Sequence, residues 1–207
     1  MRLLVFGATG RVGRRVVEVG LAAGHDITAF VRTPAKLNMG HERLFIVQGD
    51  ALDPSAVRAA MATRFDAVIG ALGADPAKPS TIVQDSTRVI VEAMRATGHT
   101  RYLGVGALGL LPANWLGRMF GRLIRVTPLR HGLRDHTAAL EILRGSGLTW
   151  TLAAPPRITD DAPRGHYKLV TEFRGGMSSI AALDLADFLI RELEARRYPN
   201  QPMGVWY

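Results

Sequence analysis

Residues 3–13 read LLVFGATGRVG, and this stretch decides the fold. The four apolar residues from Leu3 to Phe6 are typical of a buried strand, and the glycines after them open a helical pattern. In such a unit the first glycine permits a tight turn, the second lets the backbone approach a pyrophosphate, and the third lets the helix pack on the strand. The start of the helix adds free N–H groups and partial positive charge. We therefore expect a dinucleotide-binding loop formed by Gly7, Ala8, Thr9, Gly10, Arg11, Val12 and Gly13.

The end of the second expected strand bears on which dinucleotide binds. NAD sites usually carry Asp or Glu there to hold the ribose 2′-hydroxyl, whereas this chain reads Val31-Arg32-Thr33. The guanidinium of Arg32 suits a 2′-phosphate, and Arg11 could approach the same group. We therefore expect NADP(H) to be preferred over NAD(H). The alternative is that Arg32 is a solvated loop residue.

Two further segments follow expected strands. In a doubly wound sheet the carboxyl ends of the strands line the ligand crevice. We therefore expect the first segment to lie near the adenine and the second near the ribose and pyrophosphate. The first holds Asp50, Ala51 and Leu52, and the second holds Ala71, Leu72 and Gly73. Asp50 has an alternative role as the cap of the helix near Pro54.

Short apolar runs alternate with helical patterns along most of the chain. We expect strands at 3–6, 26–31, 44–47, 67–69, 102–105 and 149–154, and helices at 11–23, 54–62, 80–97, 135–144 and 183–195. Apolar strands separated by helices predict a doubly wound, mostly parallel α/β sheet of the Rossmann-like class. We expect one domain over residues 1–207, with a cofactor half to about 106 and a substrate side from about 107.

Composition narrows the class of protein. The net charge is +8, yet the arginines are scattered and no nucleic-acid-binding signature accompanies them, so we expect no nucleic-acid partner. The absence of cysteine excludes disulfides, thiolate metal sites and cysteine nucleophiles. No histidine cluster has metal-ligand spacing, so we expect no metal. The first apolar run is too short for a signal peptide or a membrane span, which predicts a cytoplasmic protein.

Several motifs together resemble the atypical short-chain dehydrogenases. The nearest similarity is to the flavin reductase/biliverdin reductase B group and its NmrA-like relatives. It is carried by GATGRVG at 7–13, VR at 31–32, GDALD at 49–53, Asp135-His136, and SGLTWTLAAPPRITD at 146–160. The resemblance covers nearly the whole chain. It implies a single-domain NADPH binder, and the reductases among these proteins pass hydride to flavins or linear tetrapyrroles.

The chain differs from these relatives at the residues that transfer protons in them. The ordinary short-chain dehydrogenase pairs a Tyr with a Lys four residues later, and neither Tyr102 nor Tyr167 has that Lys. The flavin reductase group has a Ser after the fifth strand and a His after the Pro-Pro pair, where this chain has Gly106 and Arg157. Because the nicotinamide itself supplies hydride, we expect catalysis by positioning, with Gly106 beside the cofactor.

Two side chains are candidate catalytic residues. Arg157 could stabilise negative charge on a reduced acceptor, or it could hold the Pro-Pro loop to Asp160 or Asp161. His136, like His131, lies near an expected helix start and has a pKa range suited to proton donation. For His136 we favour the alternative of a local hydrogen bond with Asp135.

Residues 108–132 form an insert before the helix expected at 135. Its apolar residues at helical spacing are Trp115, Leu116, Met119, Phe120, Leu123 and Ile124, and the opposing side carries Arg118, Arg122 and Arg125. Basic amphipathic segments can lie on a membrane surface or on a partner. A lid over the pocket or core is the more frequent outcome. We expect the insert to select a flat apolar or aromatic substrate.

Three functions from different classes fit these observations. The first is an NADPH-dependent reductase acting on an aromatic, quinone-like or flavin-like small molecule. The second is a non-catalytic, NmrA-like protein that binds NADP(H) and senses redox state. The third is a surface-binding protein that uses the basic insert. The sequence leaves monomer and homodimer equally open.

Overall fold

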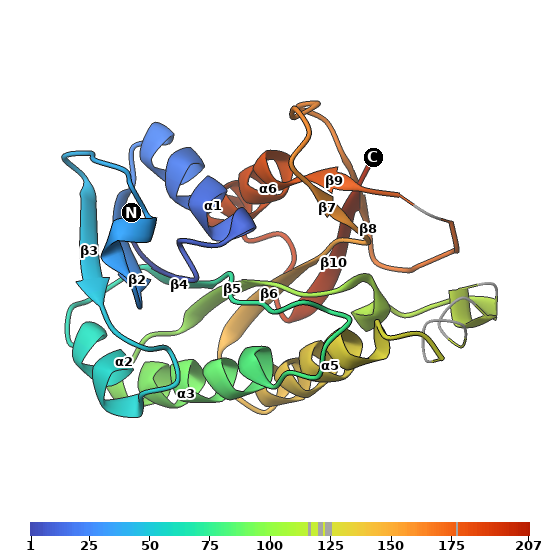
Figure 1. Ribbon diagram of the computed structural model, residues 1–207, viewed down its shortest axis with the longest axis horizontal. Coiled ribbons are helices and arrows are strands. Elements are labelled where there is room, and N and C mark those ends of the chain that lie inside the picture. The colour runs from blue at the N-terminus through green and yellow to red at the C-terminus, as the bar shows by residue number, and fades with distance from the viewer. Residues whose placement is uncertain (116, 120–121, 123–125, 177) are drawn as a thin grey trace.

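Eight strands form one sheet at the centre of the structure, a computed structural model that describes residues 1–115, 117–119, 122, 126–176 and 178–207 (Figure 1). Their order is β3-β2-β1-β4-β5-β6-β10-β8, and the pairs are parallel except for β10 with β8. This arrangement confirms the predicted mostly parallel α/β sheet. The strands are β1 (Arg2–Phe6), β2 (Asp26–Val31), β3 (Leu44–Gln48), β4 (Ala67–Gly70), β5 (Arg101–Val105), β6 (Thr149–Ala154), β8 (Lys168–Val170) and β10 (Gln201–Trp206).

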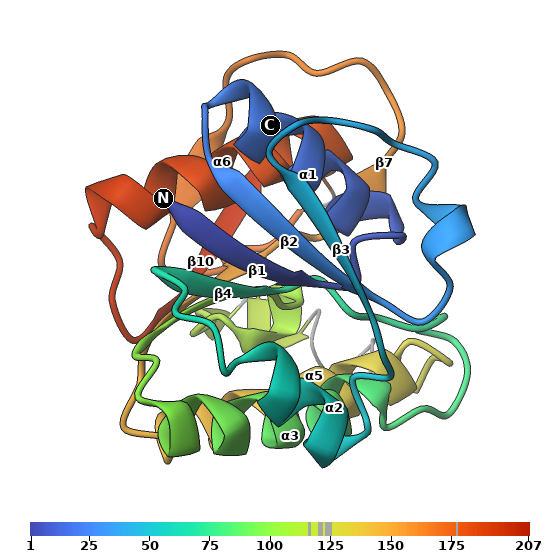
Figure 2. The same cartoon turned by 90° about the vertical axis from the view of Figure 1, so that its left-hand side faces the viewer.

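Helices cover both faces of this sheet (Figure 2). One face carries α1 (Arg11–Ala22) packed against α6 (Ala182–Ala195), and the other carries α2 (Pro54–Ala60), α3 (Ile82–Thr97) and α5 (Arg130–Arg144). The described residues also form two short 3-10 turns and a small parallel pair of strands outside the main sheet. These are η1 (Pro34–Lys36), η2 (Leu108–Leu110), β7 (Ile158–Thr159) and β9 (Ile180–Ala181).

Each face of the sheet has its own apolar core. Val16 and Val17 of α1 lie in one buried cluster with Leu185 of α6, while Met94 of α3 and Leu143 of α5 lie in the other. Burial of each such side chain contributes about 1.5–3 kcal/mol. The helical spacing of these residues explains why the helices were predictable, since only one stripe of each helix faces the sheet.

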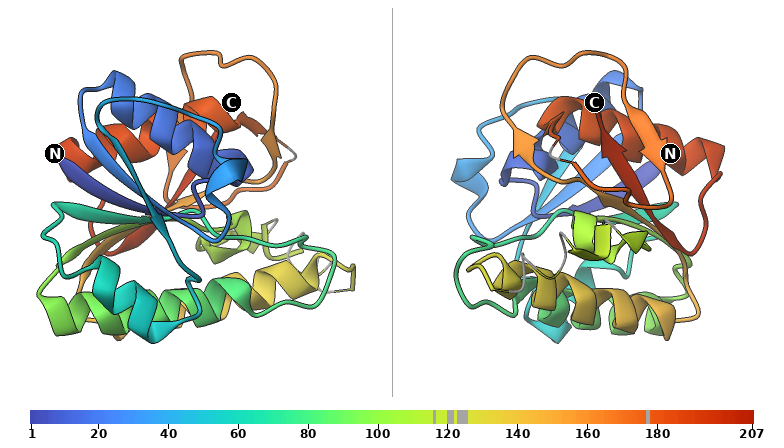
Figure 3. Two further views of the ribbon diagram at one scale, coloured as in Figure 1. Left: turned by 60° about the vertical axis from the view of Figure 1, so that its left-hand side comes forward. Right: turned by 90° about the vertical axis from the view of Figure 1, so that its right-hand side faces the viewer.

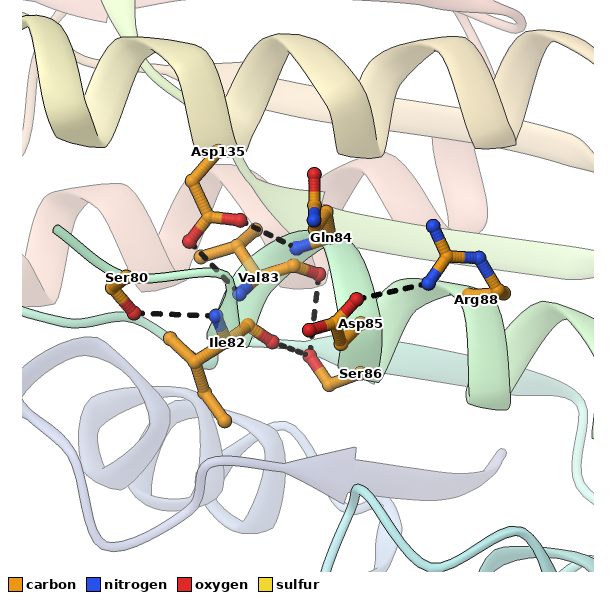
Figure 4. A network of polar contacts seen from close by, with 8 residues as sticks. All are labelled: Ser80, Ile82, Val83, Gln84, Asp85, Ser86, Arg88 and Asp135. Atoms are coloured by element: carbon orange, nitrogen blue, oxygen red, sulfur yellow. Dashed lines mark hydrogen bonds and ion pairs between the residues drawn. The ribbon is translucent and has the colours of Figure 1, made fainter.

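The N-terminus of α3 is capped by a residue of α5 (Figure 4). The carboxylate of Asp135 accepts hydrogen bonds from the backbone N–H groups of Val83 at 3.1 Å and Gln84 at 2.8 Å. Because α5 begins at Arg130, the prediction that Asp135 opens this helix is wrong. Its carboxylate serves the free N–H groups of a neighbouring helix, where negative charge is favoured, instead of pairing with His136.

The C-terminal part contains strands that the sequence analysis missed. β10 joins the sheet beside β6, and β8 closes the edge. The segment between β7 and β8, orange in Figure 3, arches over α6. Two backbone N–H groups of this segment, those of Arg164 and Gly165, donate to the carboxylate of Asp184 in the first turn of α6.

The insert is described only in part. It starts with η2, and α5 begins at Arg130, five residues before the helix start expected at 135. Its residues Leu116, Phe120, Leu123, Ile124 and Arg125 lie outside the described residues.

Candidate functional site

The glycine loop between β1 and α1 packs tightly against the end of β4. Gly7 has a φ of 78°, and a Cβ there would lie 2.6 Å from the carbonyl oxygen of Ala71. A Cβ on Gly13 would lie 2.1 Å from the carbonyl oxygen of Gly7. Both glycines are therefore required by the fold, since no side chain fits at either position.

Gly10 has a different environment. Its φ is −79°, and the nearest atoms to a Cβ there would be the carbonyl oxygens of Gly7 at 3.2 Å and Ala71 at 3.9 Å. Gly10 is the N-cap of α1, so no side chain covers the first N–H groups of the helix, and the first turn has no acidic residue. This exposed cradle of N–H groups, which a side chain at Gly10 would fill, fits the phosphates of a dinucleotide.

Arg11 extends from this loop toward the C-terminal part of the chain. Its Nε lies 3.2 Å from an oxygen of Asp160, and its Nη1 donates to the carbonyl of Ile158 at 3.1 Å. Arg11 is thus bound to residues in and beside β7, and it does not lie together with Arg32. The arginine of α1 that reaches the segment after β2 is Arg14, whose guanidinium donates to the carbonyls of residues 36 and 37.

Arg32 is the first residue after β2, and its side chain is exposed. Among the described residues its guanidinium forms no ion pair. Its carbonyl accepts a hydrogen bond from the side chain of Gln48 at 3.3 Å, which links the ends of β2 and β3. A fixed backbone with an unpaired cation suits the binding of an anionic group.

The segment after β3 has a defined turn. Oδ1 of Asp50 accepts the N–H of Leu52 at 3.0 Å, and Asp53 caps α2 by accepting the N–H groups of Ser55 and Ala56 at 2.8 and 3.3 Å. The alternative role of Asp50 as the helix cap is therefore wrong, because Asp53 holds that position. Ala51 is buried and Leu52 is 43% exposed at the sheet edge.

The ends of β4 and β5 differ in accessibility. Ala71 donates its N–H to the carbonyl of Phe6 at 2.9 Å, and a Cβ on Gly73 would meet no atom within 4 Å. Gly106 is buried, and a Cβ there would lie 2.9 Å from the side chain of Leu110. The β4 end is therefore open to a ligand, whereas Gly106 is packed against the side chain of Leu110.

His136 lines a small cavity between the sheet, α3 and α5. The cavity has a volume of about 10 Å³, enough for one water molecule. Burial lowers the pKa of His136, and the nearby Asp135 raises it in part. Burial also raises the pKa of Tyr102 to about 12. The cavity is lined by Gly70, Leu72, Val83, Ser86, Thr87, Ile90, Tyr102, Val105, His136, Ala139, Leu143 and Leu152.

Arg157 lies between β6 and β7 with an exposed side chain. Its carbonyl accepts the N–H of Ile180 at 2.9 Å, which fixes its backbone beside β9. Within the described part of the chain its guanidinium forms no ion pair with Asp160 or Asp161. Asp160 pairs with Arg11 instead, so the alternative that Arg157 ties the Pro-Pro loop to Asp160 does not hold.

A larger cavity lies where β5, β6 and β10 end. Its volume is about 200 Å³, and Phe173 and Trp206 meet in it edge to face with ring centroids 6.5 Å apart. The lining residues are Leu108, Pro156, Phe173, Gly175, Gly176, Ser178, Trp206 and Tyr207. This aromatic cavity was not predicted from the sequence, because β10 and β8 were not predicted.

Tyr207 is held in place beside this cavity by several polar contacts. Its hydroxyl donates to Asp184 at 2.5 Å and accepts the N–H of Ala181 at 3.0 Å. The guanidinium of Arg164 lies 4.0 Å from the centre of its ring. One wall of the cavity is therefore rigid.

The described residues contain no group of three or more His, Asp or Glu side chains that could hold a metal ion. None of the helices in the described part of the chain is long and apolar enough to cross a membrane.

Comparisons with known proteins place this geometry in context. The family described as NAD(P)H-binding matches residues 7–196. The chain is 24% identical to the uncharacterized protein YwnB of Bacillus subtilis, over 99% of this chain and 98% of that protein.

Two solved structures share its fold over nearly their whole length. A Streptococcus pneumoniae protein provisionally named an NADH-flavin reductase is 26% identical, with a TM-score of 0.78 and coverage of 100% and 99% of the two chains. ChuY, an anaerobillin reductase from Escherichia coli O157:H7, is 22% identical, with a TM-score of 0.78 and coverage of 100% and 97%.

Proposed function

The chain belongs to the NAD(P)H-binding family, and from that premise we propose that it is an NADPH-dependent reductase of an aromatic, quinone-like small molecule. The observation that carries the proposal is the position of the aromatic cavity. It lies at the carboxyl ends of β5, β6 and β10, and these strands are parallel to β1, whose carboxyl end carries the glycine loop. A nicotinamide cofactor and an aromatic acceptor would therefore meet at the carboxyl ends of the parallel strands.

We assign the cofactor to the crevice along this edge. The N–H groups at the start of α1 would bind the pyrophosphate, with Gly10 leaving room for it. Leu52 would contact the adenine, the open segment from Ala71 to Gly73 would border the ribose, and Arg32 would bind the 2′-phosphate. When bound, NADPH supplies the hydride.

The size of the aromatic cavity favours one acceptor class. At about 200 Å³ it is smaller than the roughly 300–1,000 Å³ of a typical drug-sized site, so it suits a single flat ring system. Phe173 and Trp206 offer ring faces and edges for stacking. A quinone-like ring fits this volume better than a linear tetrapyrrole does.

The role we propose for the protein in the chemical step is orientation and charge stabilisation. Holding an acceptor beside the nicotinamide can supply several kcal/mol of the barrier. Arg157, exposed and without an ion-pair partner among the described residues, would stabilise negative charge on the reduced acceptor. His136 would stay neutral at pH 7 because burial lowers its pKa, and the cavity that it lines is separate from the aromatic one.

The test is steady-state oxidation of NADPH with a panel of quinones and flavins. We expect turnover with quinones, a loss of about 10-fold or more in Arg157→Met, and little loss in His136→Ala. Arg58→Met, which changes an exposed arginine on α2, is the matched control. A loss of about 100-fold in His136→Ala with none in Arg157→Met would replace this account with a histidine acid.

The non-catalytic redox-sensing alternative has a distinct outcome in the same assay. It would give tight binding of NADPH by calorimetry with no turnover on any acceptor. The missing Tyr-Lys pair is the observation that favours it.

A further inference from the structure

The segment from residue 113 to residue 134, here called the basic arm, has an unusual charge pattern. From residue 93 to residue 134 the sequence contains no Asp or Glu. The arm itself carries five arginines, which are Arg118, Arg122, Arg125, Arg130 and Arg134. With no acidic residue to offset these arginines, the arm is positively charged along its whole sequence.

The basic arm also exposes large apolar side chains. Trp115 is 69% exposed, Met119 54%, Val126 74% and Leu129 47%. Trp115 and Met119 are both helical and are four residues apart, the spacing at which side chains share one side of a helix. Single exposed apolar residues are common, but several within fifteen positions indicate a binding surface.

Both ends of the basic arm are fastened to the body of the protein. At its start Phe173 donates its N–H to the carbonyl of Pro112 at 2.8 Å and accepts the N–H of Asn114 at 3.3 Å. Near its end the N–H of Gly132 donates to the carbonyl of Pro76 at 3.1 Å. The described residues of the arm lie at the right of Figure 1, where they lead into and include the start of α5, far from β3. These bonds hold the arm at the outer surface.

The partner of such a surface must offer both negative charge and an apolar phase. Two copies of this chain meeting symmetrically through the arm would bring arginines against arginines, which disfavours self-association. Nucleic acid offers phosphates but no apolar phase for Met119, Val126 and Leu129. An anionic bilayer offers both, because apolar side chains enter the boundary between headgroups and acyl chains while arginines pair with lipid phosphates.

We propose that the basic arm docks this protein on the surface of an anionic lipid bilayer. Trp115, Met119, Val126 and Leu129 enter the interface, and the exposed Arg118, Arg122 and Arg134 bind lipid phosphates. Phe173, which anchors the arm, also lines the aromatic cavity, so docking brings that cavity close to the membrane surface. The proposal stands on charge and exposure and does not depend on the reductase activity.

Co-sedimentation with sucrose-loaded vesicles tests this proposal. We expect binding to vesicles of phosphatidylcholine with phosphatidylglycerol, weak binding to phosphatidylcholine alone, and release as salt rises. Arg118→Glu with Arg122→Glu should weaken binding about 30-fold or more, at roughly fivefold per charge removed near the surface. Trp115→Ser with Met119→Ser should weaken it to both vesicle types.

Matched controls separate docking from general charge and general apolar exposure. Arg58→Glu alters an exposed arginine on α2, and Phe45→Ser alters a 55% exposed aromatic residue on β3, so both should bind like the parent protein. Circular dichroism and thermal unfolding verify that every variant is folded. Fluorescence of Trp115, taken as the difference from Trp115→Phe, should be quenched by brominated lipid.

Several results would overturn the proposal. These are equal binding to neutral and anionic vesicles, no binding to either, or equal losses in the arm variants and in the two controls. Retention on duplex DNA at a salt concentration where vesicles do not bind would assign the arm to nucleic acid instead.

Discussion

Replacement of Gly10 by valine separates cofactor binding from folding more cleanly than any other change in the glycine loop. At −79° its φ is one that valine adopts, and the one tight contact of a Cβ would be with the carbonyl oxygen of Gly7 at 3.2 Å, since that of Ala71 lies 3.9 Å away. A shift of a few tenths of an ångström relieves that contact. Exchange of an N-cap glycine for an apolar residue costs about 1 kcal/mol. We therefore expect Gly10→Val to fold, with its free energy of unfolding lowered by about that amount.

Cofactor binding should respond far more strongly. The two methyl groups of valine would stand over the first N–H groups of α1, where the phosphates approach. A hydrogen bond to a charged group contributes about 1.5–3 kcal/mol, so each one lost weakens binding by roughly 10- to 150-fold. With two such bonds lost, NADPH affinity should fall by at least about 100-fold.

Calorimetric titration with NADPH measures this difference. Gly40→Val is the matched control, because Gly40 is exposed and a Cβ there would meet nothing within 4 Å. Gly13→Val marks the other extreme and should fail to fold, since its Cβ would lie 2.1 Å from a carbonyl oxygen. If Gly10→Val has native circular dichroism and binds NADPH as tightly as Gly40→Val does, the loop is only a turn and the reasoning is refuted.

Three further outcomes are expected. Arg32→Ala should weaken NADPH binding by about 10- to 150-fold and NADH binding little, and equal losses in calorimetry would contradict the 2′-phosphate assignment. Burial lowers the pKa of His99, whose Nε2 accepts the N–H of Phe65 at 3.1 Å. The stabilisation by neutral His99 is therefore full above about pH 6.5 and declines as the pH falls toward the lowered pKa. Urea unfolding at pH 5 and 7.5 should show this decline in the free energy of unfolding, and His99→Gln should make the decline smaller. Glu192→Ala should cost about 3–5 kcal/mol in urea unfolding, because it leaves the guanidinium of Arg101, 5% exposed and 3.3 Å from that carboxylate, buried without its charge partner; a loss below about 1 kcal/mol would mean that water reaches Arg101.

The cofactor half was predictable because its signals are local. A side chain at Gly13 would clash with the same turn, and one at Gly7 would clash with the adjacent end of β4. An apolar run followed by a helical pattern can also be recognised without any distant part of the sequence. The error at Asp50 was also local, since Asp50 and Asp53 both precede Pro54 and only the observed hydrogen bonds assign the cap. Sequence spacing limits the N-cap of α2 to the residues of one turn. The observed hydrogen bonds identify Asp53 as the cap.

The substrate side could not be predicted in the same way. β10 contains Pro202 and Gly204, which weaken any strand signal, and its pairing with β6 joins residues about 50 positions apart. The aromatic cavity then depends on Tyr207 reaching Asp184, a contact that neither periodicity nor spacing indicates. Because Asp184 also accepts N–H groups from the arch over α6, the arch, the helix and this wall of the cavity form one hydrogen-bonded unit. Changes in that unit should therefore alter the choice of acceptor more than the packing of Gly7 and Gly13, and they reach the glycine loop through the ion pair of Asp160, at the start of the arch, with Arg11.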